Sequence, residues 1–362
     1  MTSFPASRNA HVGKTMLRLA APALWLAGCS PAAADLPPPE VVADGAMEGQ
    51  VLFVTNKGED TLSKVDLATG EEVQRVDSCT TPHELAVSPD GRHVALGCYG
   101  GRSITILRTA DLVVVKEIEL GEGARPHGIV WHANGNLYAT AEGREAMVRV
   151  EDPLGEAPVL AEFKTNKKGT HMLTVAPDGS AAWTVDMGSG TVTRIDLAGD
   201  SPPLSVPMGE EPEGISLSPD GTALWVSARG SNEAFELDPA TLEVRKRLET
   251  GRFPLRLAIR PQGDVAITSN LEDATLSVIE LASGELTRTI KVGGPGQAEQ
   301  RFQVTVLWSD DGSRIYVAET GSNTVAEVDY AGGKVLRHFL VGEDGDGLAV
   351  VALPESEGSG DE

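Results

Sequence analysis

The amino-acid sequence predicts an all-β fold, a seven-bladed β-propeller, because a short turn motif recurs and strand-like runs separate its copies. The motif ends an apolar run and is clearest in Leu-Ala-Val-Ser-Pro-Asp-Gly at residues 85–91. It recurs roughly every 45 residues, the period of a repeated supersecondary unit such as a propeller blade. The glycines that end its copies are Gly91, Gly135, Gly179, Gly221, Gly263 and Gly312.

Each repeat contains four runs that have the pattern of β-strands. The second run follows the turn glycine directly, as at residues 224–226, and the third alternates apolar and polar residues, as at 275–281. A glycine-bearing turn then leads to the fourth run, as at 286–292. Alternation bounded by Gly, Asp and Pro is typical of antiparallel strands joined by tight turns. Four strands per repeat predict propeller blades, and no run after residue 50 has a convincing helical pattern.

The two ends of the folded chain predict how the ring closes. Six complete repeats begin near residues 83, 127, 171, 213, 255 and 303. The run at 51–56 has the pattern of a second strand without a first, and the run at 347–353 that of a first strand without the rest. Pairing these runs makes a seventh blade and removes the exposed edges of an open array. We therefore expect one propeller domain at residues 51–353.

A family resemblance supports the same fold. Leu-Phe-Val-Thr-Asn at residues 52–56, followed by Asp-Thr-Leu-Ser-Lys-Val-Asp at 60–66, resembles the YVTN-type β-propeller repeat. That repeat is shared with surface-layer and lactonase-like propellers, and the resemblance covers about residues 51–353. The superfamily includes lactonases, lyases, adhesive surface proteins and DNA binders, so the resemblance implies a fold and no single function.

The beginning of the chain predicts export. Residues 1–28 combine basic residues with a largely apolar run at 17–27, the layout of a secretion signal. Leu-Ala-Gly-Cys at 26–29 resembles the bacterial lipobox, which implies that Cys29 becomes lipidated. The alternative is an ordinary cleaved signal that happens to contain this cysteine.

The segments that flank the propeller have the composition of disordered chain. Residues 29–50 are rich in Pro and Ala and predict a tether that follows the lipidated cysteine, and the acidic residues 354–362 predict a disordered tail. Ser30, directly after the cysteine, favours the outer membrane. We therefore expect a protein of the bacterial cell envelope that is anchored by lipid and faces the periplasm.

The overall charge narrows the expected partners. The chain has 30 basic and 53 acidic residues and a net charge of −23. A surface this acidic repels phosphate backbones, so nucleic acid is not an expected partner. Membrane contact is expected through the lipid anchor only. The expected partners are a small molecule, a peptide, a glycan or another envelope protein, and we expect a monomer.

Two cysteines lie inside the predicted propeller. Cys79 precedes the first strand of a blade and Cys98 ends the second strand of the same blade, so both should lie on one face. A disulfide is the expected state in an oxidising compartment. Two buried thiols or a soft-metal pair remain as alternatives, although the spacing matches no zinc-finger pattern.

One repeated position points to a site at the mouth of the central channel. It lies eight residues before each turn glycine, where the innermost strand begins, and holds His83, His127, His171, Glu213, Leu255 and either Gln303 or Val304. Imidazoles and a carboxylate are suitable donors for first-row divalent metals. We therefore predict that one divalent ion is held by the three histidines and Glu213. The alternative is that duplication has left histidines that only cap loops, or that they stand too far apart for one ion.

A second repeated position ends each second strand on the same side of the ring. It holds Asn56, Cys98, Ala141, Asp186, Ala228, Asn270 and Glu319. Glu142 follows this position, and Arg125, Arg252 and Arg301 each precede an inner strand, where they could hold a carboxylate or phosphate. We predict that Arg125, Arg252, Arg301, Glu142, Asn56 and Asn270 bind ligand. The alternative for Asn and Asp is that they satisfy the backbone of turns.

Three functions are compatible with these patterns. The first is a binding protein that presents the channel mouth to a ligand. The second, implied by the resemblance to lactonase and streptogramin-lyase propellers, is a metal-dependent hydrolase or lyase with Glu213, Asp186 or Glu319 as the base. The third is a scaffold in an envelope assembly. The sequence contains no serine-nucleophile elbow and no haem attachment motif, so whether the protein is an enzyme stays open.

Overall fold

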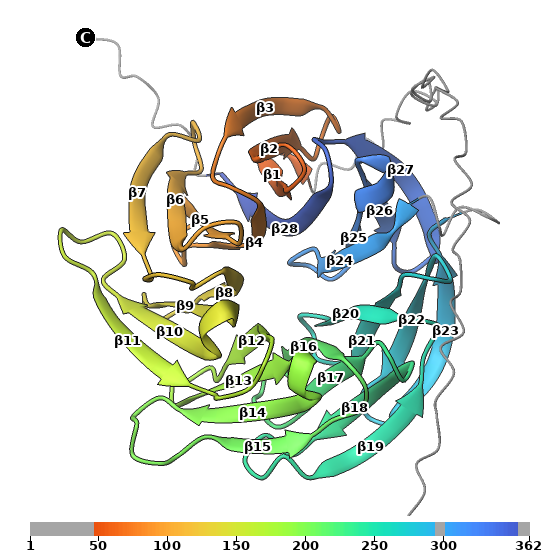
Figure 1. The fold of residues 1–362 in the computed structure, drawn as a ribbon. Helices are drawn as coiled ribbons and strands as arrows, with labels where there is room; N and C mark the ends of the chain where they lie inside the picture. Colours follow the sequence, from red (N-terminus) through yellow and green to blue (C-terminus); the bar gives the residue numbers. More distant parts are fainter. Residues whose placement is uncertain (1–46, 294–300, 354–362) are drawn as a thin grey trace, which may run out of the picture. The chain divides into compact units, whose positions relative to one another are not determined.

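The fold is a ring of seven four-stranded antiparallel sheets, so the predicted seven-bladed propeller is confirmed (Figure 1). A computed structural model describes residues 47–293 and 301–353. The predicted signal, Cys29, most of the tether and the acidic tail lie outside these residues. The folded unit begins slightly before the expected residue 51, because Met47 is buried against Tyr316 and the first strand starts at Gln50.

The blades follow one another along the chain, apart from the one that joins the two ends. Blade 1 contains β28 (Gly345–Ala352), β1 (Gln50–Asn56), β2 (Thr61–Asp66) and β3 (Glu72–Asp77). Blade 2 contains β4 (Pro82–Val87), β5 (His93–Cys98), β6 (Ser103–Arg108) and β7 (Val114–Glu119). Blade 3 contains β8 (Pro126–Trp131), β9 (Leu137–Ala141), β10 (Ala146–Glu151) and β11 (Val159–Lys164). Blade 4 contains β12 (Thr170–Val175), β13 (Ala181–Asp186), β14 (Thr191–Asp196) and β15 (Leu204–Pro207).

The remaining blades repeat the same order. Blade 5 contains β16 (Pro212–Leu217), β17 (Leu224–Ala228), β18 (Glu233–Leu237) and β19 (Val244–Glu249). Blade 6 contains β20 (Pro254–Ile259), β21 (Val265–Asn270), β22 (Thr275–Glu280) and β23 (Glu285–Lys291). Blade 7 contains β24 (Gln303–Trp308), β25 (Arg314–Glu319), β26 (Thr324–Asp329) and β27 (Lys334–Leu340). Short 3-10 turns follow three of the second strands, at η2 (Glu142–Arg144), η3 (Met187–Ser189) and η4 (Thr320–Ser322).

The ring closes as the sequence predicts. β28 pairs antiparallel with β1, with Leu348 opposite Val54 and Gly345 opposite Asn56. This pairing gives blade 1 its innermost strand from the far end of the chain. Within the described residues no helix is long and apolar enough to cross a membrane.

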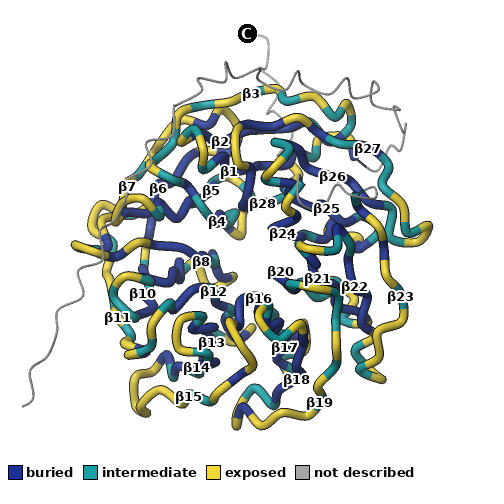
Figure 2. Tube along the Cα trace, turned by 45° about the vertical axis from the view of Figure 1, so that its right-hand side comes forward, coloured by how far each residue is buried: buried dark blue, intermediate teal, exposed yellow. Residues whose placement is uncertain are grey.

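The hydrophobic core lies between neighbouring blades. Ile104 and Ile106 of blade 2 pack in one cluster with Leu137 and Val148 of blade 3, and the other clusters also join adjacent sheets. The inner and middle strands are therefore buried on both faces, whereas outer strands such as β11 alternate between exposed and half-buried residues (Figure 2). This burial holds the inner strands as a firm wall around the channel.

Every inner strand contains a β-bulge at the same height. In β4, Pro82 pairs with Cys98 and Leu85 with Leu96, so His83 and Glu84 together face the single residue Gly97. The same break occurs in β8, β12, β16, β20, β24 and β28. Bulges re-aim side chains, and here the bulges of β4 and β20 let the second bulge residues Glu84 and Arg256 meet across the channel.

Hydroxyl groups on the second strands fix these bulges. Thr140 Oγ1 accepts a hydrogen bond from Gly128 N (2.9 Å) in its own blade and donates one to His171 O (2.7 Å) in the next. Likewise, Ser269 Oγ accepts a hydrogen bond from Arg256 N (3.0 Å) and donates one to Val304 O (2.7 Å) in the next blade. Each hydroxyl thus ties the bulge of one blade to the bulge of its neighbour.

A left-handed residue precedes every inner strand at the channel mouth. Its φ lies between 46° and 67° in Thr81, Arg125, Gly169, Glu211, Phe253, Phe302 and Asp344. Only one of the seven is glycine, although this conformation is costly for bulky side chains. Each carbonyl accepts a hydrogen bond from the residue after the second strand, as in Tyr99 N to Thr81 O (3.1 Å) and Arg229 N to Glu211 O (3.1 Å). These bonds set the position of a second circle of side chains around the mouth.

Candidate ligand site at the channel mouth

The first bulge residues form an inner ring of side chains at the mouth. This inner ring consists of Asp346, His83, His127, His171, Glu213, Leu255 and Val304, in blade order from 1 to 7. The structure therefore brings together the four side chains predicted to bind metal. It also resolves the ambiguity in blade 7, because Val304 lines the cavity while Gln303 pairs with Glu319 in the sheet. Asp346 was not predicted, because the closing strand was expected to begin at residue 347 and begins at Gly345.

The three histidines stack side by side. The ring centroids of His83 and His127 lie 4.2 Å apart, and those of His127 and His171 lie 3.7 Å apart. Carboxylates bind the outer two imidazoles. His83 Nδ1 lies 2.8 Å from Asp346 Oδ2, and His171 Nδ1 lies 2.9 Å from Glu142 Oε2. Although burial favours neutral imidazole, the hydrogen bonds to Glu142 and Glu213 raise the pKa of His171 above its ordinary value.

The middle histidine is in a different state. His127 is buried, and its Nδ1 has no hydrogen-bond partner in the described part of the chain. Burial, followed by the neighbouring His171 and His83, lowers the pKa of His127 well below 6.5. His127 is therefore neutral at pH 7 and keeps a lone pair for a proton, a hydrogen-bond donor or a metal.

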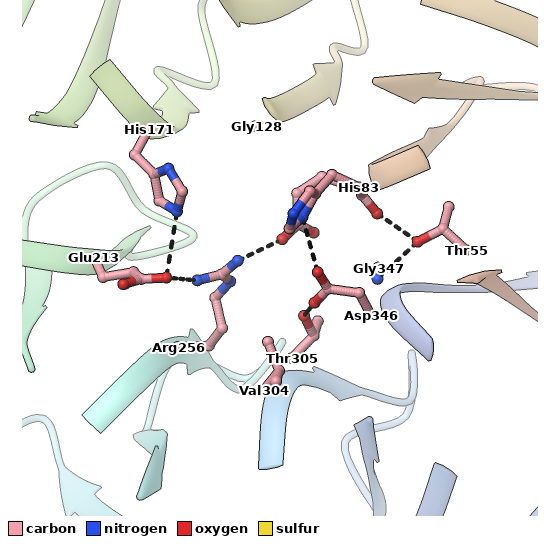
Figure 3. A network of polar contacts seen from close by, with 12 residues as sticks. Thr55, His83, Gly128, His171, Glu213, Arg256, Val304, Thr305, Asp346 and Gly347 are labelled. Carbon is pink, nitrogen blue, oxygen red and sulfur yellow. Dashed lines mark hydrogen bonds and ion pairs between the residues drawn. The ribbon is translucent and has the colours of Figure 1, made fainter. Parts of the chain in front are cut away.

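A buried arginine connects opposite sides of the ring. Arg256, the second bulge residue of β20, lies 2.5 Å through Nη1 from Glu213 Oε1 and 2.8 Å through Nη2 from Glu84 Oε1 (Figure 3). Glu84 belongs to blade 2 and Arg256 to blade 6, so this ion pair spans the channel. Arg229 adds a contact of 2.6 Å between its Nη1 and Glu213 Oε2. Burial alone would raise the pKa of Glu213, but the hydrogen bond to His171 and the two arginines lower it to about 2.

A second ring of side chains lies just outside the inner ring. It consists of the residues that directly follow the second strands: Lys57, Tyr99, Glu142, Met187, Arg229, Leu271 and Thr320. Lys57 Nζ lies 3.0 Å from Asp346 Oδ2. Tyr99 donates a hydrogen bond of 3.1 Å to Glu142 Oε1 and stands edge-on to His83 and His127. Of this ring, only Glu142 was predicted as a site residue from the sequence.

The polar residues that end the second strands face into the blades instead of the mouth. Asn56 donates to Thr61 Oγ1 (2.9 Å) and Ser63 Oγ (2.7 Å), and Asn270 is held in the same way by the third strand of its own blade. Asp186 accepts hydrogen bonds from Thr170, Thr184, Thr191 and Thr193. Glu319 binds Thr324 and Arg301. Side chains alternate along a strand, so the predicted position was one residue too early to line the mouth.

The three predicted arginines also stand apart from the cavity. Arg125 stacks over Tyr99, with its guanidinium carbon 4.3 Å from the ring centroid. Arg252 is exposed and pairs with Asp273 at 2.7 Å. Arg301 pairs with Glu319 inside blade 7. The cations that line the cavity are Lys57, Arg229 and Arg256, and the bulge that turns Arg256 inward has no signature in the sequence.

The cavity between the rings has a volume of about 300 Å³. Its lining consists of Lys57, His83, Tyr99, His127, His171, Met187, Glu213, Arg229, Phe253, Leu255, Arg256, Leu271, Val304 and Asp346. A volume of this size is at the lower end of the range for small-molecule sites. The mouth therefore has room for a small ligand.

A disulfide lies next to the site. Cys79 and Cys98 are joined, with their Cα atoms 5.7 Å apart. The bond links the segment that leads to His83 with the end of β5, directly before Tyr99. The disulfide therefore fixes the backbone positions from which the side chains of His83 and Tyr99 enter the mouth.

Three groups at the mouth are suited by type to hold a metal ion. His83, Glu84 and His127 each offer a ligand atom, and these atoms lie within 4.8 Å of one another. Asp346 binds Nδ1 of His83, and carboxylates often bind metal-ligating histidines in this way, at the nitrogen that does not face the metal. His171 and Glu213, also predicted as ligands, lie outside this group and contact each other at 3.3 Å.

Comparison with known proteins supports the fold. No protein-family model and no curated protein matches the chain. Among solved structures, a functionally unknown protein from Desulfotomaculum acetoxidans has a TM-score of 0.70 at 14% identity, covering 84% of this chain and 99% of that one. A periplasmic gluconolactonase from Pseudomonas aeruginosa has a TM-score of 0.67 at 18% identity, covering 84% and 99%. A virginiamycin B lyase from Staphylococcus aureus has a TM-score of 0.65 at 16% identity, covering 77% and 91%.

These likenesses show a propeller whose structural neighbours include lactonases and lyases. At identities below one fifth they show the fold alone.

Proposed function

We propose that this protein binds a small ligand at the channel mouth. The observation that carries the proposal is the inner ring itself, in which five consecutive blades place ionisable side chains around one cavity. Burying charged groups lowers stability unless each is well paired, and a simple propeller could fill these positions with apolar residues, as blades 6 and 7 do. Perturbed ionisable groups gathered in a cavity are typical of functional sites.

Unpaired polar atoms support the same conclusion. Nδ1 of His127 and Nε of Arg256 are buried without a hydrogen-bond partner among the described residues. Native proteins leave few buried polar atoms unpaired unless a ligand, an ion or water completes them. A ligand that accepts or donates hydrogen bonds at the mouth would satisfy such groups.

The place of action is part of the proposal. The signal-like residues 1–28 and the lipobox-like sequence at Cys29 support attachment to the bacterial cell envelope by lipid, with the mouth open to the periplasm. The disulfide supports an oxidising compartment. Radiolabelled palmitate incorporated into wild-type protein but not into Cys29→Ser would support the anchor, and equal labelling of both would reject it.

A ligand screen tests the binding function. Purified full-length protein is heated with each member of a chemically diverse metabolite library, and stabilising compounds are titrated by calorimetry. We expect His127→Ala to weaken the binding of such a compound at least tenfold, because His127 is central to the cavity. His93→Ala is the matched control, since His93 lies outside the mouth. Equal binding by wild type and His127→Ala for every compound would reject a site at the mouth.

A metal-dependent hydrolase or lyase is the second candidate. The grouping of His83, Glu84 and His127 favours it. A divalent ion at these donors would polarise a carbonyl of the ligand. The neighbouring carboxylates and imidazoles would orient the substrate and move its proton. One feature weighs against it, because Glu84 is already paired with Arg256.

Elemental analysis separates the two candidates. The second requires about one divalent ion per chain in the purified protein, and loss of that ion in the double variant His83→Gln, His127→Gln but not in His93→Gln. Metal at background level in the wild type would reject the second candidate and leave the first in place.

A further inference from the structure

The cavity has two chemically different sides. Blades 1 to 5 place ionisable groups in the inner ring, whereas blades 6 and 7 place Leu255 and Val304 at the same positions. In the second ring, Leu271 of blade 6 occupies the position that holds Lys57 in blade 1 and Arg229 in blade 5. Both rings are thus apolar in blade 6, and Val304 continues the apolar side into blade 7.

Phe253 extends the apolar side to the rim. It is the left-handed residue of blade 6, with a φ of 58°, and its side chain lines the cavity. A bulky residue in this conformation costs free energy that glycine would avoid. The phenyl ring also stacks with Arg229, whose guanidinium carbon lies 5.1 Å from the ring centroid. Phe253 therefore stands at the border between the apolar and the charged sides.

The charged side presents cations to a ligand. The side chains of Lys57 and Arg229 are 24% and 21% exposed, whereas those of Asp346 and Glu213 are 0% and 4% exposed. The two carboxylates are also occupied. Asp346 contacts Lys57 and His83, and Glu213 contacts His171 and both arginines. Among the charged residues that line the cavity, the cations are thus more exposed than the carboxylates. Outside the lining, Arg229 also pairs with the exposed Glu211 at 3.1 Å.

We propose that the ligand is a small amphipathic anion. Its acid group, with one negative charge, is bound by Arg229, which lies beside Phe253. Its aryl or branched aliphatic group lies on Phe253, Leu255, Leu271 and Val304. The volume of about 300 Å³ limits the ligand to a small molecule. This inference rests on the proposed binding function and names the class of ligand.

Four commercial probes test the ligand class by calorimetry on the purified full-length protein at pH 7. They are 4-phenylbutyrate, acetate, 4-phenylbutan-1-ol and 4-phenylbutylammonium, which separate the acid group from the apolar group and reverse the charge. We expect 4-phenylbutyrate to bind at least tenfold more tightly than acetate and the alcohol, and the ammonium compound to bind most weakly. Equal binding of the acid and the ammonium compound, or of 4-phenylbutyrate and acetate, would overturn the proposal.

Matched variants test where the acid group and the apolar group of the ligand bind. Phe253→Gly suits the left-handed backbone and should fold, and we expect it to weaken 4-phenylbutyrate at least fivefold. Phe302→Gly changes the equivalent residue of blade 7, which does not line the cavity, and should leave binding unchanged. Arg229→Gln should weaken 4-phenylbutyrate at least fivefold and leave the alcohol unaffected, whereas the exposed Arg252→Gln should change neither. Equal losses in a variant and its control would overturn the assigned positions.

Different experimental outcomes reject the proposed ligand class and the proposed binding function. If no probe binds while the metabolite screen finds a ligand that depends on His127, the class is wrong and the site stands. If the probes bind equally to wild type and His127→Ala at low affinity, their binding is unrelated to the mouth and the class is also rejected.

Discussion

Two buried carboxylates in neighbouring blades show how differently this fold treats negative charge. Asp186 of blade 4 is enclosed by four threonine hydroxyls within one sheet, and burial raises the pKa of Asp186. Glu213 of blade 5 faces the channel between Arg229, Arg256 and His171, which lower its pKa to about 2. The first carboxylate is satisfied by neutral donors of its own blade. The second depends on charged partners, two of which, His171 and Arg256, come from the neighbouring blades.

The difference separates a structural role from a binding role. A polar residue completed by its own sheet leaves nothing for a ligand to replace, as at Asp186 and Asn270. The mouth instead contains charges that complete one another across the ring. Polarity and burial alone do not distinguish the blade interiors from the mouth. What distinguishes them is whether the hydrogen-bond and ion-pair partners come from the same sheet or from other blades.

Removing Arg256 should have the largest effect on stability. Arg256→Met leaves Glu84 and Glu213 buried without their shared cation, and breaking a buried pair in this way costs roughly 3–5 kcal/mol. Denaturant unfolding followed by circular dichroism measures the loss. Arg252→Met is the control, because its exposed ion pairs contribute at most about 1 kcal/mol. Similar losses in both variants would mean that the charges at the mouth are not mutually dependent.

The next largest effect is expected in the pH dependence of stability, which tests the lowered pKa of Glu213. Its folded-state pKa of about 2 lies below the ordinary 4.5, so its ionised form stabilises the fold above pH 4.5, and this contribution is lost as the pH falls towards 2. The shift corresponds to about 3 kcal/mol. The free energy of unfolding, measured at pH 6, 4.5 and 3, should therefore fall less steeply in Glu213→Gln than in the wild type. A parallel fall in both proteins would contradict the lowered pKa.

A smaller effect is expected inside blade 4. Asp186→Ala leaves four threonine hydroxyls without their acceptor, and each unsatisfied buried group costs roughly 1–3 kcal/mol unless the site relaxes. We expect a total near the lower end, about 2 kcal/mol, because Thr170 and Thr193 have other partners. Ligand affinity should stay unchanged in titration calorimetry. Weaker binding by this variant would show that the blade interior and the mouth are coupled.

The hydroxyl ties between bulges should contribute least. Thr140→Val keeps the shape of the side chain but removes the hydrogen bonds to Gly128 N and His171 O. The expected loss is about 1 kcal/mol, together with a weaker affinity for any ligand that touches His171. Thermal unfolding and calorimetry of the same variant check both. Unchanged affinity would show that the bulge holds its position without the hydroxyl.

The fold was predictable because its signals are local and repeated. Turn glycines such as Gly91 and Gly179 have the left-handed φ that the turn requires, and the split blade follows from the unmatched runs at the two ends. The histidines of the inner ring were found because duplication kept them at one spacing from those glycines.

The rest of the site was less accessible to prediction. The direction of a side chain at the end of a strand depends on alternation and on the bulge, and a shift of one residue moves the side chain from the blade interior to the mouth. This is why Asn56 was selected instead of Lys57, and Asn270 instead of Leu271. Arg256 and Glu84 lie far apart in the chain, and only the closed ring brings them together.

The ion pair across the channel also bears on how the protein is made. Ribosomal synthesis proceeds from blade 2 towards blade 7, so Glu84 is made well before its partner Arg256. The last ionisable side chain of the inner ring, Asp346, belongs to β28, the strand that closes the ring. An unfinished or clipped chain therefore lacks a complete pocket, however many of its sheets have formed. Occupancy by ligand would report that a molecule has been built to its end.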